Sequence, residues 1–151
     1  MNLHEYQAKE LMAKHGVQIP PGYPATSVEE AKTAIEKLFN EGHRHVVVKS
    51  QIHAGGRGKG TFKDGFQGGV HLADSIDDAT SKAEAMFGNV LVTKQTGEEG
   101  RQVNRLLITS AQEIKSEYYV AVLLDRAKGR AIIMASAEGG MNIEEIAEES
   151  P

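Results

Sequence analysis

Apolar and polar residues recur along the chain with two different spacings, and together these predict a mixed α and β protein. Apolar positions three or four residues apart, which are typical of a helix with one buried face, cover residues 3–15 and 28–40, and a third helix is predicted over 76–87 from a cap and a closing glycine. Short runs rich in branched or aromatic side chains, which are typical of strands, cover residues 23–26, 45–50, 70–73 and 90–94. Alternation of these elements predicts a compact α+β lobe over about 20–95.

Each predicted helix begins with two residues at the spacing of a capping box, in which a polar side chain and the residue three places later bind each other's backbone N–H groups. The pairs are Asn2 with Glu5, Ser27 with Glu30, and Ser75 with Asp78. Glycine follows each helix, as is common where a helix ends. A Pro-Pro-Gly sequence at 20–22 separates the first helix from the lobe.

The pattern changes after a glycine-rich turn at 97–100. Longer apolar segments without helices between them predict strands at 105–109, 118–125 and 131–136, the last two forming a hairpin through Lys128 and Gly129. A final helix is expected from Asn142 to Pro151. A third sheet that begins at 105 has only about three strands, so we expect an uncovered edge or face and a chain that is the amino-terminal piece of something longer, or that needs a partner.

The stretch with the most chemical content is residues 46–60. Three valines and Lys49 form the predicted strand, and a loop follows with glycines at 55, 56, 58 and 60 and two more cations, Arg57 and Lys59. Glycine lets backbone N–H groups approach a ligand closely, and with three cations nearby these amides predict a seat for a polyphosphate. On composition alone, a cationic hairpin tip explains the stretch equally well.

Two familiar phosphate motifs are excluded by spacing. A P-loop requires Ser or Thr after its lysine, but Gly60 follows Lys59. A dinucleotide fingerprint that starts at Gly56 requires glycine where Thr61 stands. A lysine on the strand, followed by the glycine loop, is an order that suits a nucleotide clamped between two sheets.

Composition and net charge limit the classes of function that the sequence allows. The chain has 151 residues, 40% of them hydrophobic, with 17 basic and 21 acidic side chains and a net charge of −4. No overall field therefore attracts nucleic acid or anionic lipid, and an RNA-binding loop is a minor alternative. The absence of cysteine excludes disulfides and fits a reducing compartment. With no signal sequence and no long apolar run, we expect a soluble, cytoplasmic protein that binds neither nucleic acid nor membrane.

Four motifs resemble the β subunit of bacterial succinyl-CoA synthetase, the ADP-forming succinate–CoA ligase. They occupy residues 1–9, 51–59, 91–97 and 138–144 and read MNLHEYQAK, QIHAGGRGK, LVTKQTG and EGGMNIE. The resemblance implies an ATP-grasp fold, an α+β arrangement of two lobes that hold the nucleotide between them. It implies a helix over 1–19 that packs on the larger lobe, a complete small lobe over 20–103, and a truncated large lobe over 104–151.

The resemblance also implies the nucleotide contacts. Seven residues match family positions: Lys49, Gly56, Arg57, Gly58, Thr109, Gln112 and Glu117. The lysine would neutralise phosphates, residues 56–58 would cover them, the hinge at 109–112 would meet the purine mainly through backbone groups, and Glu117 would bind the ribose. Many relatives carry glutamate in place of Thr109, so this chain departs from the family pattern at that position.

The family reaction sets the expected cofactors and partners. ATP phosphorylates a histidine of the α subunit, succinate takes the phosphate, and CoA displaces it, as a step of the tricarboxylic acid cycle. The cofactors implied are ATP or ADP and Mg²⁺, whose ligands are expected beyond Pro151. No nucleophile or other catalytic residue is expected from this chain. A malate–CoA ligase β subunit, and a non-catalytic isolated ATP-binding fragment, remain alternatives, and ADP or GDP preference stays open.

Overall fold

The computed structural model describes residues 3–137, which fall into two compact units. The first unit is Met1–Gln112 and the second is Glu113–Pro151, and each is described by itself. The helix expected from Asn142 lies outside the described residues.

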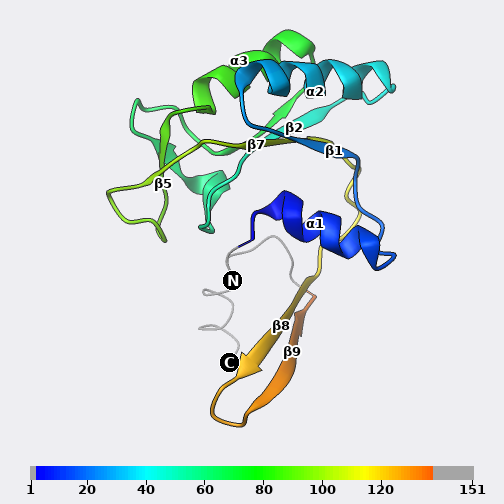
Figure 1. Ribbon diagram of the computed structural model, residues 1–151, viewed down its shortest axis with the longest axis vertical. Helices are drawn as coiled ribbons and strands as arrows, with labels where there is room; N and C mark the ends of the chain where they lie inside the picture. Colours follow the sequence, from blue (N-terminus) through cyan, green and yellow to red (C-terminus); the bar gives the residue numbers. More distant parts are fainter. Residues whose placement is uncertain (1–2, 138–151) are drawn as a thin grey trace. The chain divides into compact units, whose positions relative to one another are not determined.

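A four-stranded antiparallel sheet in the order β1-β7-β2-β4 forms the centre of the first unit (Figure 1). Its strands are β1 (Gly22–Ala25), β7 (Leu106–Ser110), β2 (Val46–Ser50) and β4 (Val70–Ala73). All five residues of β7 are buried because this strand lies between β1 and β2. The segment expected to open a separate sheet at 105 is therefore an inner strand of this one, and the division between units follows Gln112 rather than residue 103.

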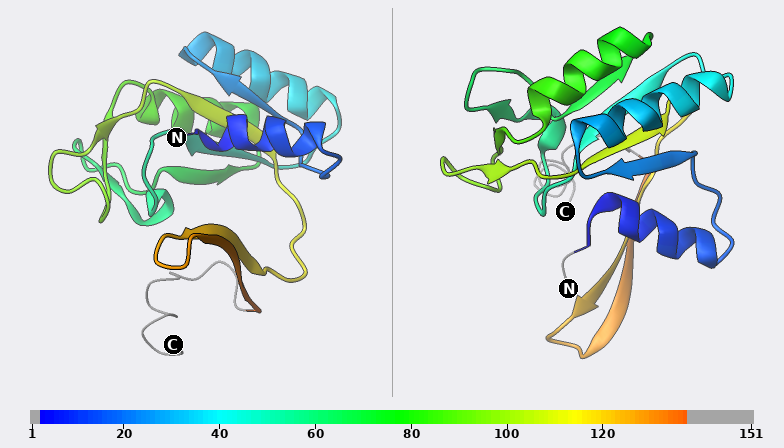
Figure 2. Two further views of the ribbon diagram at one scale, coloured as in Figure 1. Left: turned by 60° about the horizontal axis from the view of Figure 1, so that its bottom comes forward. Right: turned by 45° about the horizontal axis from the view of Figure 1, so that its top comes forward.

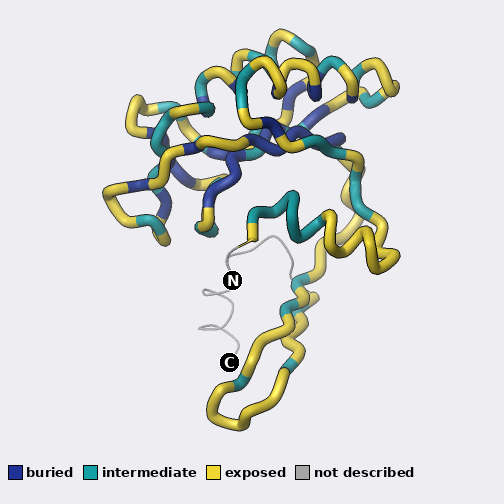
Figure 3. Tube along the Cα trace, in the orientation of Figure 1, coloured by how far each residue is buried: buried dark blue, intermediate teal, exposed yellow. Residues whose placement is uncertain are grey.

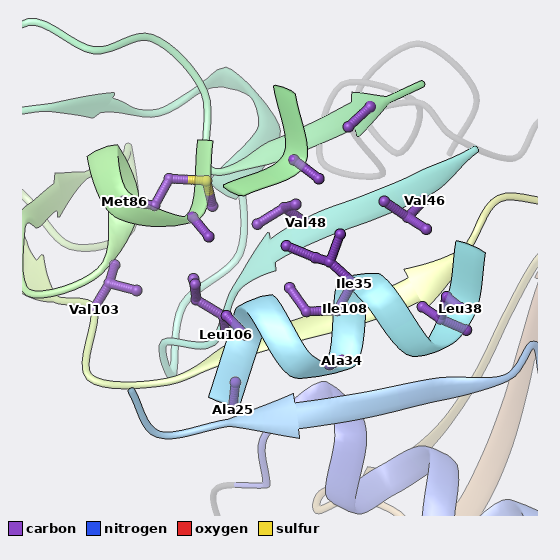
Figure 4. Close-up of a cluster of buried hydrophobic side chains, with 14 of the residues drawn as sticks. Ala25, Ala34, Ile35, Leu38, Val46, Val48, Met86, Val103, Leu106 and Ile108 are labelled. Carbon is purple, nitrogen blue, oxygen red and sulfur yellow. The ribbon is translucent and has the colours of Figure 1, made fainter. Parts of the chain in front are cut away.

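Two helices cover one face of this sheet, and α1 (Glu5–Lys14) lies against the other (Figures 1 and 2). The covering helices are α2 (Val28–Asn40) and α3 (Ile76–Met86). Ile35 and Leu38 of α2 and Met86 of α3 meet Val46 and Val48 of β2 in the core, as Figure 4 shows. All five side chains are fully buried, so Ile35 and Leu38 of the predicted inward face of α2 are confirmed as core residues.

The predicted caps Ser27 and Ser75 were correct, although Glu30 accepts from the N–H of Thr26 rather than that of Ser27, and the predicted cap of the first helix was wrong. The hydroxyl oxygens of Ser27 and Ser75 accept hydrogen bonds from the backbone N–H groups three residues later, at 3.1 and 3.2 Å. The cap of α1 is His4, whose backbone N–H donates to Gln7 Oε1 at 2.9 Å. Asn2 and Glu5 are not the capping pair, because the carboxylate of Glu5 is engaged with side chains elsewhere in the unit.

A second sheet of three short strands stands beside the glycine loop. It comprises β3 (Thr61–Phe62), β5 (Val90–Val92) and β6 (Arg101–Gln102), with the one-turn 3-10 helix η1 (Arg57–Lys59) just before β3. Phe62 is only 1% exposed, because it pairs with Leu91 and joins the core.

The second unit contains the predicted hairpin, formed by β8 (Tyr119–Asp125) and β9 (Arg130–Ser136). Asp125 Oδ1 accepts hydrogen bonds from the backbone N–H groups of Ala127 and Lys128, and Gly129 has φ +60°, which glycine adopts without strain. Most of the hairpin is exposed, as Figure 3 shows. Val120, Val122 and Leu124 are among its exposed residues.

Candidate functional site

Lys49 is placed by the alternation of side chains along β2. Val46, Val48 and Ser50 of this strand are buried, whereas Val47 and Lys49 are only half-buried. Successive side chains of a strand point to opposite faces, so Lys49 leaves the sheet away from the core formed with α2 and α3. Its ammonium reaches Glu5 of α1 instead.

Glu5 gathers three cations around one carboxylate. Its Oε1 lies 2.9 Å from Lys49 Nζ and 3.0 Å from Lys9 Nζ, and its Oε2 lies 2.9 Å from Arg57 Nη2. Burial raises the pKa of this carboxyl group, but hydrogen bonds and charge from Lys49, with further hydrogen bonds from Lys9 and Arg57, outweigh burial and lower the pKa to about 2. Glu5 is therefore a fixed anion between the two cations that the sequence assigned to phosphate.

Arg57 is held by the backbone on both sides of its loop. Its Nη1 donates to the carbonyl oxygen of Ser50 at 2.6 Å, and its own carbonyl oxygen accepts from the N–H of Gly69 at 2.8 Å. A Cβ at Gly69 would lie 2.6 Å from Leu91 Cδ2 and 3.1 Å from Arg57 O, so only glycine fits there without movement. The guanidinium is thus fixed at the end of β2, on the same carboxylate as Lys49.

The glycine loop has one open side. Gly56 has φ +73°, a left-handed conformation that ordinary side chains avoid, and it precedes η1. A Cβ added at Gly58 would meet nothing within 4 Å. The N–H of Gly55 donates to Gln95 Oε1 at 2.7 Å, which ties the loop to the turn after β5. A ligand can therefore approach the backbone of Gly58 closely while the loop stays anchored.

The end of β7 limits how a purine could be bound. Thr109 is 3% exposed, and its Cγ2 would lie 2.7 Å from a Cβ added at Gly22. The N–H groups of Ser110 and Ala111 already donate to the carbonyl oxygens of Pro21 and His45. Because these N–H groups are already used, the side chain of Gln112 and the backbone carbonyl groups are the parts of the expected hinge at 109–112 that are best able to bind a base.

Two further residues that the resemblance assigned to the nucleotide are Gln112 and Glu117. Gln112 donates from Nε2 to the hydroxyl of Ser110 at 2.9 Å. Glu117 is exposed and precedes β8 in the second unit. The structure therefore brings Lys49 and Arg57 together on one carboxylate. Gln112 follows the end of β7 in the same unit.

Sequence reasoning missed two residues that organise the site. Glu5 was interpreted only as a helix cap, because its partners are 44 and 52 positions away and no local pattern marks them. Gln95 lies in a motif noted for its resemblance, but its bond to Gly55 spans 40 positions. Many helices begin with an acidic residue, so this feature alone does not identify Lys49 and Arg57 as partners of Glu5. Only the three-dimensional structure shows these ion pairs.

Residues 3–137 contain neither a cluster of metal-binding side chains nor a helix able to span a membrane. This part of the chain holds no group of three or more His, Asp or Glu side chains arranged to bind a metal ion. We assign Mg²⁺ to none of the described residues. Among the described helices, none is long and apolar enough to cross a membrane.

The described residues therefore form an α+β module in which a strand lysine and a loop arginine share one counterion beside an anchored glycine loop. The model of the ATP-grasp domain matches residues 2–151, and the chain belongs to this family. The ATP-grasp fold expected from the sequence is confirmed, whereas a truncated large lobe stays a prediction.

Comparison with curated proteins narrows the relationship. The chain is 55% identical over its whole length to the succinate–CoA ligase (ADP-forming) subunit beta of Erythrobacter litoralis, and 55% identical to that of Opitutus terrae. It spans 38% of the length of each of these relatives. Among solved structures, D-alanyl-alanine synthetase A from Vibrio cholerae has a TM-score of 0.49 and 15% identity, over 99% of this chain and 39% of that one.

Proposed function

We propose that this chain is the amino-terminal, nucleotide-binding part of the β subunit of an ADP-forming succinate–CoA ligase. The observation that carries the proposal is the placement of Lys49 and Arg57, 2.9 Å from opposite oxygens of one carboxylate at the edge of the glycine loop. Two cations held this close together, with N–H groups beside them, suit a polyphosphate. The names of the relatives favour succinate over malate as the acid.

Each assigned residue then has a distinct role. Lys49 and Arg57 neutralise the phosphates of ATP or ADP, and the backbone of residues 56–58 covers them. Thr109 and Gln112 border the purine, and Glu117 accepts hydrogen bonds from the ribose hydroxyls. The transferred phosphoryl group carries negative charge on its oxygens, so positioning and charge neutralisation supply most of the catalysis and no nucleophile is needed from these residues.

The wider assignment follows from the same relationship. The acceptor of the phosphoryl group is a histidine of an α subunit, and the complete enzyme makes or cleaves succinyl-CoA in the tricarboxylic acid cycle. Mg²⁺ accompanies the nucleotide, with ligands supplied from outside the described residues. A metabolic ligase with no cysteine among its 151 residues fits the cytoplasm. The 151 residues alone should bind nucleotide without completing the ligase reaction.

Calorimetric titration of the chain with ATP, ADP and GTP, each with and without Mg²⁺, tests the proposal. We expect saturable binding of ATP or ADP, and loss of that binding in Lys49→Ala. Absence of binding by any of the three nucleotides, in a chain whose circular dichroism shows it folded, would contradict the assignment. Turnover of succinate, CoA and ATP by the chain alone would contradict the expected inactivity of the isolated piece.

A further inference from the structure

A second cationic site lies in the first unit, in a cleft of about 530 Å³. The start of α1, the segment after β2, and the stretch that joins β6 to β7 all contribute to its walls. The polar side chains on which the argument depends are His4, Gln7, Gln51, His53, Arg101 and Arg105. The volume is within the range of small-molecule sites in proteins, roughly 300–1,000 Å³.

The charge in this cleft is not balanced by its walls. Two arginines and two histidines line it, and no Asp or Glu stands among the described residues that do so. At the neighbouring pair of Lys49 and Arg57, by contrast, Glu5 supplies the negative charge. The whole chain has a net charge of −4, so this accumulation of positive charge is local.

The two histidines of the cleft are also affected by this excess of positive charge. The rings of His4 and His53 are stacked with their centroids 4.0 Å apart. Burial first, and then the charges of His53, Arg105 and Arg57, lower the pKa of His4. Nδ1 of His4 is buried and has no hydrogen-bond partner among the described residues. An anion in the cleft would relieve the repulsion among these groups.

The walls are also held in place. Arg105 Nη1 donates to the hydroxyl of Tyr6 at 2.6 Å, which leaves its other N–H groups for a ligand. Gln51 accepts from the N–H of Tyr6 through Oε1 and donates to Ser50 O through Nε2. Ile52 is the one aliphatic side chain among the described residues of the lining, so the cleft offers little to a hydrophobic group.

We propose that this cleft binds a compact oxyanion with two negative charges, held by the guanidinium groups of Arg101 and Arg105. Guanidinium groups bind phosphate and carboxylate oxygens in pairs, and inorganic phosphate and a short dicarboxylate share this chemistry. The site goes beyond the proposed nucleotide function, because it uses neither Lys49 nor the glycine loop.

NMR titration of the full chain, at constant ionic strength, with phosphate, succinate and acetate tests the proposal. We expect saturable shifts of the His4 and His53 ring signals with phosphate or succinate, and none with acetate. The tighter of the two dianions identifies the source of the ligand. Failure of both dianions to bind, or equal effects of acetate, would overturn the proposal.

Variants of the two lining arginines test whether the dianion binds in this cleft. Arg101→Gln and Arg105→Gln should each weaken dianion binding about tenfold, since a charge-assisted contact is lost. Arg105→Lys should retain part of the affinity. Arg44→Gln is a charge-matched control, because Arg44 is exposed in the same unit and does not line the cleft. An effect of Arg44→Gln as large as that of Arg105→Gln would mean diffuse screening and contradict the proposal.

Lys49→Ala separates this inference from the proposed function. The variant should lose nucleotide binding and keep dianion binding. If Lys49→Ala abolishes the phosphate shifts, the ion binds at the nucleotide site and the inference fails. If the wild-type chain binds a dianion in the cleft but no nucleotide, the inference holds and the proposed function fails.

Discussion

The ammonium of Lys49 lies 2.9 Å from a carboxylate oxygen of Glu5, which precedes it by 44 positions. The same carboxylate binds Arg57 through its other oxygen. An acidic side chain therefore occupies the position between two cations where we place the phosphates of ATP or ADP. Since a phosphate and this carboxylate carry the same charge, they compete for Lys49 and Arg57.

The first prediction concerns this competition. Glu5→Gln should bind ADP about three- to tenfold more tightly than the wild type, because the phosphates no longer displace a carboxylate from a half-buried ion pair. Isothermal calorimetry measures the change. Glu10→Gln, an exposed change in the same helix, is the matched control and should leave the affinity unaltered. Unchanged or weaker binding by Glu5→Gln would mean that Glu5 positions the cations rather than competing for them.

The second prediction uses the lowered pKa of Glu5, about 2 against an ordinary value of 4.5. A carboxyl group whose pKa falls on folding stabilises the folded state above its unfolded pKa, and this stabilisation is lost as the pH falls from about 4.5 toward 2. Urea unfolding between pH 6 and 3 should therefore show a smaller loss of stability in Glu5→Gln than in the wild type. Parallel curves for the two proteins would show that the ion pairs contribute nothing to folding.

The third prediction concerns Lys49. Lys49→Ala should weaken ADP binding at least about tenfold, since one charge-assisted contact to phosphate is lost. In a complete β subunit with its partner, phosphoryl transfer should fall by roughly two orders of magnitude. The fold should survive, because Glu5 keeps Lys9 and Arg57 as partners. Lys63→Ala, an exposed change on another loop, is the control, and near-normal transfer by Lys49→Ala would count against the site.

The fourth prediction separates binding from stability in the glycine loop. Gly58 has open space where a Cβ would stand, so Gly58→Ala should leave thermal stability almost unchanged. If a phosphate approaches this backbone closely, the same methyl group should weaken ADP binding. Gly60→Ala behaves differently, because its Cβ would lie 2.8 Å from Val92 O and should lower the melting temperature. Full nucleotide affinity in Gly58→Ala would remove this loop from the site.

The fifth prediction tests the core. Ile35→Ala should lower the free energy of unfolding by about 2–5 kcal/mol, because a fully buried side chain is replaced by a cavity. Leu72→Ala, at a side chain that is 58% exposed, should cost far less. Chemical denaturation of both variants measures the difference. Equal losses would mean that the helices do not pack on the sheet as described.

Much of this fold could be predicted from the sequence, because its elements are locally encoded. The apolar spacing of α2, the serine caps of α2 and α3, and the three valines of β2 each point to one structure without reference to distant residues. The two-residue strands β3 and β6 were missed because so short a segment has no period, and they exist only through pairing with β5.

The candidate site was partly predictable for the same reason. Lys49 and Arg57 stand out locally, as a strand lysine and a loop arginine among glycines. Their common partner, Glu5, and the cleft between α1 and the stretch before β7 depend on segments far apart in the sequence. The placement of β7 inside the first sheet, rather than at the start of another, likewise follows from long-range pairing with β1 and β2.

A crystal structure of the chain with ADP tests the central claim most directly. We predict that Lys49 Nζ and the guanidinium of Arg57 lie within about 3.2 Å of phosphate oxygens, with Glu5 displaced from both. ADP bound elsewhere, with the ion pairs from Glu5 to Lys49 and Arg57 intact, would contradict it.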